Sequence, residues 1–337
     1  NNTVLARLKE SGSLGTMSFC PTEYHGRGES SYLRELGEKL DSAVDVFWTG
    51  SHVCSPALTV ENARAASASL RRTVVFWDNY PVNDLEMRFD AHLGPLTGRA
   101  PALAGVARGL VAAAGSNSES SKVALHTVAD YLSDPAGYLP EAAWRDALLA
   151  VAGSAAEADA VGTLADLARR SPLNPGTQYA NHLLGTLDRF WAAWGGVPAS
   201  SGPDLPGLPP GHGRAMAASA PDRRAALARL QGDLAPLRAA AARLLAPMAN
   251  ARLQQELRPW SEKLSGWLRV VDAALAVLAA ALHDPRDPAL SLLREAALDQ
   301  LLLTRENFHW VAGDMLDQFA RRCFWAAEEL GSTPRGG

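Results

Sequence analysis

The chain has 337 residues and a formal net charge of −4, and its lysines and arginines are scattered rather than grouped. This pattern offers no basic surface for nucleic acid or anionic lipid, so neither is an expected partner. The three cysteines, Cys20, Cys54 and Cys323, cannot all pair, show no CxxC spacing and require no oxidising compartment. The sequence is therefore consistent with a cytoplasmic protein, and the composition excludes a disulfide-stapled secreted domain.

The first 115 residues alternate short apolar runs with amphipathic segments. Strands are predicted over 14–20, 43–48 and 73–77, preceded by helices over 4–11, from Ser30 or Ser31, and from Thr59 to Arg72. The strands end at Cys20, Trp48 and Trp77, a spacing of 28 or 29 residues that is typical of successive βαβ units in a parallel sheet. A fourth strand is predicted near 91–93, although the connection to it has only about a dozen residues, the minimum for a parallel crossover.

From residue 101 onward the pattern is helical. Helices are predicted over 101–114, 118–133, 140–152, 155–170 and 177–195, separated by glycines and prolines. A Pro/Gly-rich segment, 196–219, shows no periodicity and is expected to be an exposed loop. We therefore divide the chain into an α/β part (1–115), a helical subdomain (116–195), this loop, and a helical bundle (220–331).

The bundle carries apolar residues at alternating spacings of three and four. One such seam runs from Leu227 to Leu244, and a second runs from Leu253 to Leu278, with Pro236 and Pro259 as expected kinks. A third helix is predicted from Asp287 to Leu330. The Ala-rich window from Val270 to Leu282 is shorter than a membrane span and is interpreted as bundle core. The seams would also allow a homodimer through helices.

Polar side chains cluster where the third strand ends. Trp77, Asp78, Asn79, Asn83 and Asp84 combine an aromatic ring with amides and carboxylates, a set suited to holding a sugar at the carboxyl edge of a parallel sheet. The alternative is a capped strand end with an Asx turn at Asp78 and Asn79. The residue pattern alone leaves both open.

Other chemistry finds little support in the sequence. The eight histidines never occur as HxxxH or with a carboxylate at ligand spacing, so neither a metal nor a cofactor is expected. No GxSxG motif and no phosphate-binding glycine loop is present. Two carboxylates could act on a glycosidic bond, but Glu23, Asp78 and Asp84 do not by themselves identify an acid and a base.

Four segments carry a resemblance to a known family. They are FCPTEY (19–24), FWTG (47–50), WDNYPVND (77–84) and LGPLTGR (93–99), in the same order and at compatible spacing over residues 14–133. The chain resembles the β-N-acetylglucosaminidases of glycoside hydrolase family 84, which include the O-GlcNAcases and bacterial relatives. The resemblance implies the C-terminal half of a (β/α)8 TIM barrel followed by an α-helical bundle. The Ala/Arg/Pro-rich composition fits a source in bacteria.

The resemblance also implies an activity: hydrolysis of β-linked N-acetylglucosamine, on Ser/Thr of proteins or in related glycosides. The substrate's acetamido oxygen attacks the anomeric carbon and forms an oxazoline, with retention of configuration and no protein nucleophile. Tyr24 would hydrogen-bond the acetamido oxygen, Thr49, Val53 and Trp77 would line the pocket, Asn79 would contact the acetamido or acid/base region, and Asp84 would bind the distal hydroxyls.

Two departures from the family pattern stand out. A sugar-binding Asn is replaced at about Ala113, and Asn117 is the candidate to substitute for it. The family's catalytic Asp-Asp pair does not occur in this sequence, so we expect it in an N-terminal half-barrel segment, and we expect no hydrolase activity from the chain alone. A non-catalytic carbohydrate-binding relative and a helical interaction protein are the alternative functions.

Overall fold

The structure, a computed structural model, describes residues 1–12, 16–169, 173, 181–195 and 218–332. The chain forms two compact units. The first contains residues 1–88 and 92–151, with residue 173, and the second contains 89–91, 152–169, 181–195 and 218–332. Most of the loop predicted over 196–219 lies outside the described residues.

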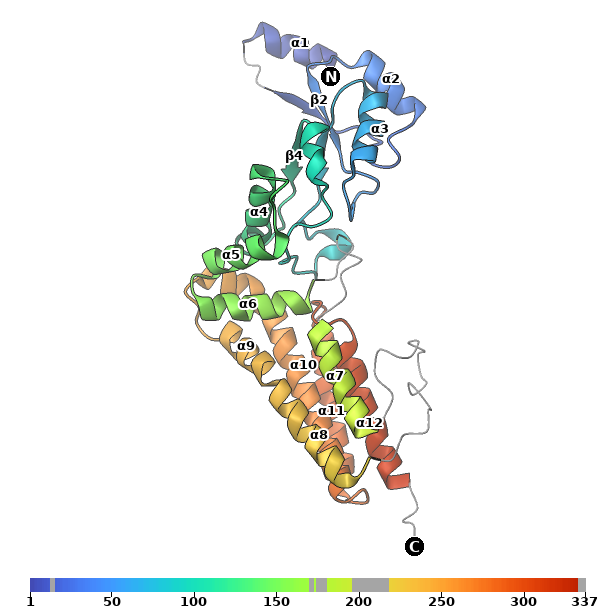
Figure 1. Ribbon diagram of the computed structural model, residues 1–337, viewed down its shortest axis with the longest axis vertical. Coiled ribbons are helices and arrows are strands. Elements are labelled where there is room, and N and C mark those ends of the chain that lie inside the picture. The colour runs from blue at the N-terminus through green and yellow to red at the C-terminus, as the bar shows by residue number, and fades with distance from the viewer. Residues whose placement is uncertain (13–15, 170–172, 174–180, 196–217, 333–337) are drawn as a thin grey trace. The chain divides into compact units, whose positions relative to one another are not determined.

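The first unit contains a parallel sheet of four strands in sequential order (Figure 1). The strands are β1 (Met17–Phe19), β2 (Val44–Trp48), β3 (Val75–Asp78) and β4 (Gly109–Ala112). Helix α1 (Asn2–Glu10) precedes the sheet, and α2 (Ser31–Lys39) and α3 (Val60–Leu70) connect its first three strands. The predicted caps are confirmed, because the side chain of Ser30 accepts a hydrogen bond from Leu33 N and that of Thr59 accepts one from Asn62 N.

One face of this sheet is packed against helices. Alternate residues of β2 and β3, Val44, Val46, Trp48 and Phe76, are buried in a core that helix residues such as Leu33, Ala63, Ala66 and Leu70 complete. The opposite face is more open, since Trp77 on β3 and Val111 on β4 are 38% and 42% exposed. These two residues are paired in register, which places them side by side on the open face.

The fourth strand is not where the sequence analysis placed it. Residues 91–93 are buried but form no strand, and the predicted helix over 101–114 is replaced by the short 3-10 helix η2 (Pro101–Gly105) followed by β4. Residues Gly109 to Ala112 pair with Val75 to Asp78 along β3, so ladder hydrogen bonds override the helix propensity of this Ala-rich segment. The connection 79–108 is also long enough for a parallel crossover.

The remaining elements of the first unit are η1 (Leu85–Met87), α4 (Ser118–Ser133) and α5 (Pro140–Ala152). The bounds of α4 and α5 confirm the predicted helices. Helix α4 packs on the segments that follow β3 through Tyr80, Met87 and Leu96.

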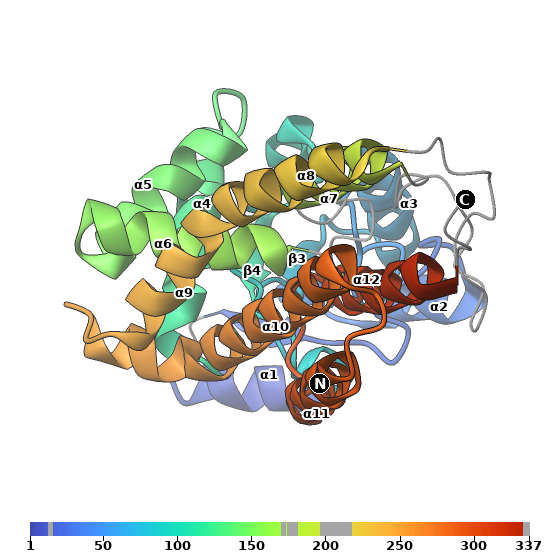
Figure 2. The ribbon, with the colours of Figure 1, turned by 90° about the horizontal axis from the view of Figure 1, so that it is seen from below.

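The second unit is helical. Its helices are α6 (Ala155–Leu167), α7 (Asn181–Trp194), α8 (Ala220–Asp233), α9 (Ala235–Leu245), α10 (Ala251–His283), α11 (Ala289–Glu306) and α12 (Met315–Ser332). Helix α10 packs against α8, α9, α11 and α12, and α7 packs against α8 (Figure 2). The seam predicted from Leu253 to Leu278 is core, since the apolar residues that define it are all buried. They are Leu253, Leu257, Trp260, Leu264, Trp267, Val271, Ala274 and Leu278. By length and composition α10 could cross a membrane, but 61% of its apolar window is buried, and buried core helices meet the same criterion.

Two details of the predicted bundle are wrong. The helix expected over 287–330 is divided into α11 and α12, because the connection between them includes Ala312 and Gly313 with positive φ, which no helix accommodates. The helix expected to run through Pro236 is divided at Leu234, whereas Pro259 lies inside an uninterrupted α10. Lys263 on α10 holds the end of α11, donating to Thr304 O at 2.7 Å and to Asn307 O at 2.5 Å.

Candidate functional site

Tyr24 and Thr49 come together at the carboxyl ends of β1 and β2. The amide of Thr49 donates to Tyr24 O at 2.8 Å, and the amide of Gly26 donates to Gly50 O at 2.9 Å, which joins the loops that follow the two strands. The Thr49 hydroxyl is buried and donates to His52 O at 2.8 Å. A hydroxyl fixed in this way retains a lone pair that can accept a hydrogen bond.

Asn62 supports this contact and was missed by the sequence analysis. Its side-chain oxygen accepts from the indole nitrogen of Trp48 at 2.7 Å, and its amide nitrogen donates to Gly26 O at 2.8 Å. The residue therefore connects the start of α3, the end of β2 and the loop that carries Tyr24. Its place on the first turn of a helix gave no sign of these contacts, which join segments far apart in the sequence.

Trp77, Asn79 and Val53 form a second hydrogen-bonded group. The indole nitrogen of Trp77 donates to Asn79 Oδ1 at 3.0 Å, and Asn79 Nδ2 donates to Val53 O at 2.8 Å. The Trp77 ring meets Phe47 edge to face, with centroids 5.2 Å apart. Because Trp77 and Val53 are both substantially exposed, the group offers an aromatic face and an aliphatic side chain to a ligand.

Asp78 does not belong to this group. Alternation along β3 turns its side chain away from Trp77 and toward the helices, where it is buried and paired with Arg99. Arg99 Nε donates to Asp78 Oδ2 at 2.7 Å, and its Nη2 donates to Asp78 Oδ1. The inclusion of Asp78 in a sugar-binding cluster is therefore wrong, and its carboxylate orders the end of β3 instead.

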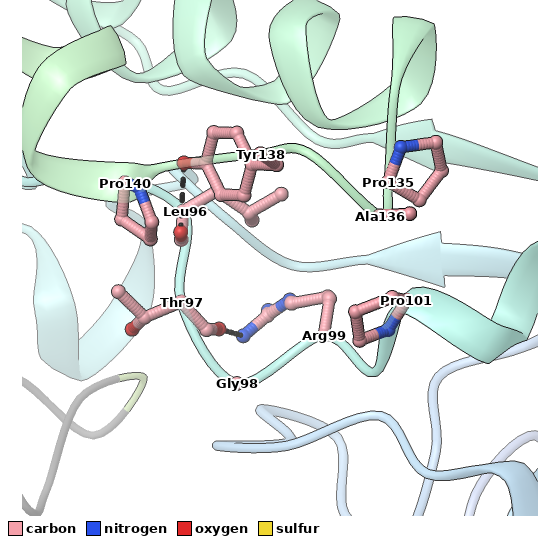
Figure 3. Close-up of a pocket in the computed structure, with 9 residues that line it drawn as sticks. All are labelled: Leu96, Thr97, Gly98, Arg99, Pro101, Pro135, Ala136, Tyr138 and Pro140. Atoms are coloured by element: carbon pink, nitrogen blue, oxygen red, sulfur yellow. Dashed lines mark hydrogen bonds between the residues drawn. The ribbon is translucent and has the colours of Figure 1, made fainter.

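Arg99 also lines a small cavity of about 190 Å³ (Figure 3). Its Nη1 donates to Thr97 O, and the Tyr138 hydroxyl donates to Leu96 O at 2.9 Å. The other lining residues are Gly98, Ala136 and three prolines, Pro101, Pro135 and Pro140. None of the predicted sugar-binding residues lines this cavity, so the candidate site lies elsewhere.

Asp84 follows the cis peptide bond between Tyr80 and Pro81 and begins η1 with its side chain exposed. Burial raises the pKa of the Cys54 thiol, and the negative charges of Asp84 and then Glu86 raise it further. Asp84 lies in the segment that follows β3, the strand that carries Trp77.

Two buried residues hold the loop that carries Asp84. The side-chain oxygen of Asn83 accepts from the amide of Ser116 at 2.8 Å and from its hydroxyl at 3.2 Å. The Nδ1 atom of His92 lies 2.8 Å from Val82 O, and burial lowers the pKa of this imidazole, which favours the neutral ring donating from Nδ1. Neither role was predicted from the sequence.

Asn117 is half-buried at the N-cap position of α4, directly after Ser116, and makes no side-chain capping bond. The amide of Ala113 donates to Asp78 O at 2.8 Å and so continues the ladder between β3 and β4. The contact between Ser116 and Asn83 brings the segment of Asn117 next to the segment of Asp84. Within the ranges that the structure describes, no group of three or more His, Cys, Asp or Glu side chains could hold a metal ion.

Known proteins similar to this chain are glycoside hydrolases. Residues 1–166 match the family model for β-N-acetylglucosaminidase. A stretch of 126 residues is 36% identical to the protein O-GlcNAcases of Rattus norvegicus and Mus musculus, and it covers 36% of this chain but only 14% of each rodent enzyme.

Solved structures extend the similarity to the helical unit. A mutant of the Thermobaculum terrenum O-GlcNAc hydrolase matches with a TM-score of 0.82 and 27% identity, covering 98% of this chain and 65% of that one. The structure of CpGH84B matches with a TM-score of 0.72 and 22% identity, covering 95% of this chain and 54% of that one, a likeness of fold. The chain thus spans only part of each relative. Residues 1–166 are thus similar to the β-N-acetylglucosaminidases, and the relatives found support the resemblance to glycoside hydrolase family 84.

Proposed function

We propose that this chain supplies one side of the sugar pocket of an enzyme that hydrolyses β-linked N-acetylglucosamine, either O-GlcNAc on Ser/Thr of proteins or related glycosides. The observation that carries the proposal is the hydrogen-bonded group of Trp77, Asn79 and Val53, next to the joined loops of Tyr24 and Thr49. These side chains follow the carboxyl ends of parallel strands, the edge at which such sheets bind ligands.

The reaction we propose is retaining and substrate-assisted. The acetamido oxygen attacks the anomeric carbon while an acid protonates the leaving oxygen, and water then opens the oxazoline. The Tyr24 hydroxyl hydrogen-bonds the acetamido oxygen, and Thr49, Val53 and Trp77 enclose the acetyl group and the sugar ring. Asn79 orients the acetamido region.

Charged and amide groups hold the other end of the sugar. Asp84 accepts hydrogen bonds from the distal hydroxyls, and Asn117 takes the part of the family's missing Asn. An exposed carboxylate in the segment after β3 suits this task, because charge-assisted hydrogen bonds to hydroxyls are both strong and directional.

The general acid and base are proposed to lie outside this chain. No Asp-Asp pair occurs in the sequence, and an N-terminal half-barrel segment would bring it. Two features support such a partner segment: the strands follow one another in sequential order, as in a TIM barrel, and one sheet face leaves Trp77 and Val111 exposed.

The test is hydrolysis of an aryl β-N-acetylglucosaminide by the protein with and without its N-terminal segment. We expect turnover only with the segment, and a first sugar product of retained configuration by proton NMR. Replacing the acetyl group by mono-, di- and trifluoroacetyl should slow the reaction progressively, because fluorine withdraws electrons from the attacking oxygen. An inverted product, or rates insensitive to fluorine, would refute the mechanism, and sugar binding without any turnover would favour the non-catalytic alternative.

A further inference from the structure

Asn83 joins two loops of the candidate site, and neither the family resemblance nor the proposed mechanism gives it a role. It is 7% exposed, and its side-chain oxygen accepts two hydrogen bonds from Ser116. The residue that follows Asn83 is Asp84, and the residue that follows Ser116 is Asn117. We propose that Asn83 is a positioning residue that couples Asp84 and Asn117 into a single clamp for the distal hydroxyls of the sugar, an inference that rests on the proposed function.

The packing around Asn83 leaves the two loops little freedom. A Cβ atom on Gly115 would lie 2.6 Å from Asn83 Oδ1 and 3.1 Å from Pro81 O, so the loop that follows β4 runs directly against the loop that follows β3. The amide of Gly115 also donates to Ser121 Oγ, at 3.1 Å, which fastens the same loop to the first turn of α4. Glycine is therefore required at 115 by close approach.

The Asp84 loop is held from its other side by His92. Its Nδ1 contacts Val82 O at 2.8 Å and Pro81 O at 3.3 Å, and the ring is 4% exposed. With Pro81 and Val82 held by His92 and Asn83 held by Ser116, the three residues that lead to the sugar-binding carboxylate of Asp84 are fixed. Pre-organisation of this kind spares the ligand the entropic cost of ordering the loop.

The coupling can be tested with two independent variants. Asn83→Ala removes the acceptor, and Gly115→Ala pushes the loops apart by steric contact alone. A typical hydrogen-bond loss corresponds to about a threefold to tenfold change in affinity, so we expect each variant to raise KM by about that factor with little change in kcat. Asn83→Asp keeps the oxygen acceptor and should restore the contact with Ser116.

A control separates positioning from general stability. Thr127, on the same helix α4, is fully buried and accepts a hydrogen bond from Leu96 N at 2.9 Å, outside the clamp. Thr127→Val should lower Tm to a similar extent and leave KM unchanged. In an Asp84→Ala background, Asn83→Ala should have no further effect on KM, because the carboxylate that Asn83 positions is already absent.

Hydrogen exchange of the peptide 113–118 provides a readout that does not depend on activity. We expect exchange of the Ser116 amide to rise in Asn83→Ala and not in Thr127→Val. Unchanged exchange would refute the contact itself, and raised exchange with an unchanged KM would refute the coupling. A wild-type protein with its N-terminal segment that neither binds nor hydrolyses the glycoside would instead refute the proposed function.

Discussion

The ion pair of Asp78 and Arg99 is the contact in the first unit whose loss we expect to destabilise it most. Both side chains are 3% exposed, and the guanidinium donates to both carboxylate oxygens and to the carbonyls of Thr97 and Pro56. In Arg99→Leu a buried carboxylate would lose its partner, a change that typically costs about 3 to 5 kcal/mol. We expect the free energy of unfolding of the first unit to fall by that amount.

The assay is native-state hydrogen exchange of β2 and β3, which reports on the first unit without contribution from the helical unit. Lys39→Leu serves as the control, because Lys39 pairs with Glu35 on the exposed surface of α2 and its loss should leave exchange unchanged. The double variant Asp78→Leu/Arg99→Leu removes both charges and should be less destabilised than Arg99→Leu alone.

The outcome bears on the site as well as on stability. Asp78 lies between Trp77 and Asn79 in the sequence. If its unpaired carboxylate moved toward water in Arg99→Leu, the end of β3 that carries these two residues would move as well. We therefore expect Arg99→Leu also to raise KM for the glycoside. Equal exchange rates in Arg99→Leu and Lys39→Leu would show that the buried pair does not hold β3, and the reasoning would fail.

Three further predictions concern single side chains. Asp84→Ala should cost about 2 to 4 kcal/mol in transition-state binding, measured as kcat/KM for an aryl N-acetylglucosaminide, and unchanged kinetics would contradict its role. Lys263→Met should cost about 2 kcal/mol of stability in thermal unfolding, because two carbonyls at the end of α11 lose their donor, and an unchanged Tm would contradict this. Burial raises the pKa of Asp90 from 3.8 to about 6, so ionisation of its carboxyl opposes folding and stability falls as the pH rises between these values. Asp90→Asn should therefore add up to about 3 kcal/mol to the free energy of unfolding at pH 7.5 and nothing at pH 3.5. An equal effect at both pH values would contradict the assignment.

The sequence alone determined much of the local structure. Apolar runs and helix caps located β1, β2 and β3 and the helices that join them, because each depends on residues a few positions apart. The heptad seam of α10 was equally visible, since its buried face repeats along one helix. Four short motifs were also enough to indicate the family, and they carry the predicted sugar-binding residues except Val53 and Asn117.

Only the tertiary structure decided which segments meet. Gly109 to Ala112 is a strand because β3 offers it a ladder, although its own composition favours a helix. Asp78 turns away from the site because Arg99, 21 residues later, supplies a buried partner, and Asn83 is a link because Ser116 lies opposite it. Such contacts arise when folding brings distant residues together, and neither hydrophobic periodicity nor secondary-structure propensity predicts them.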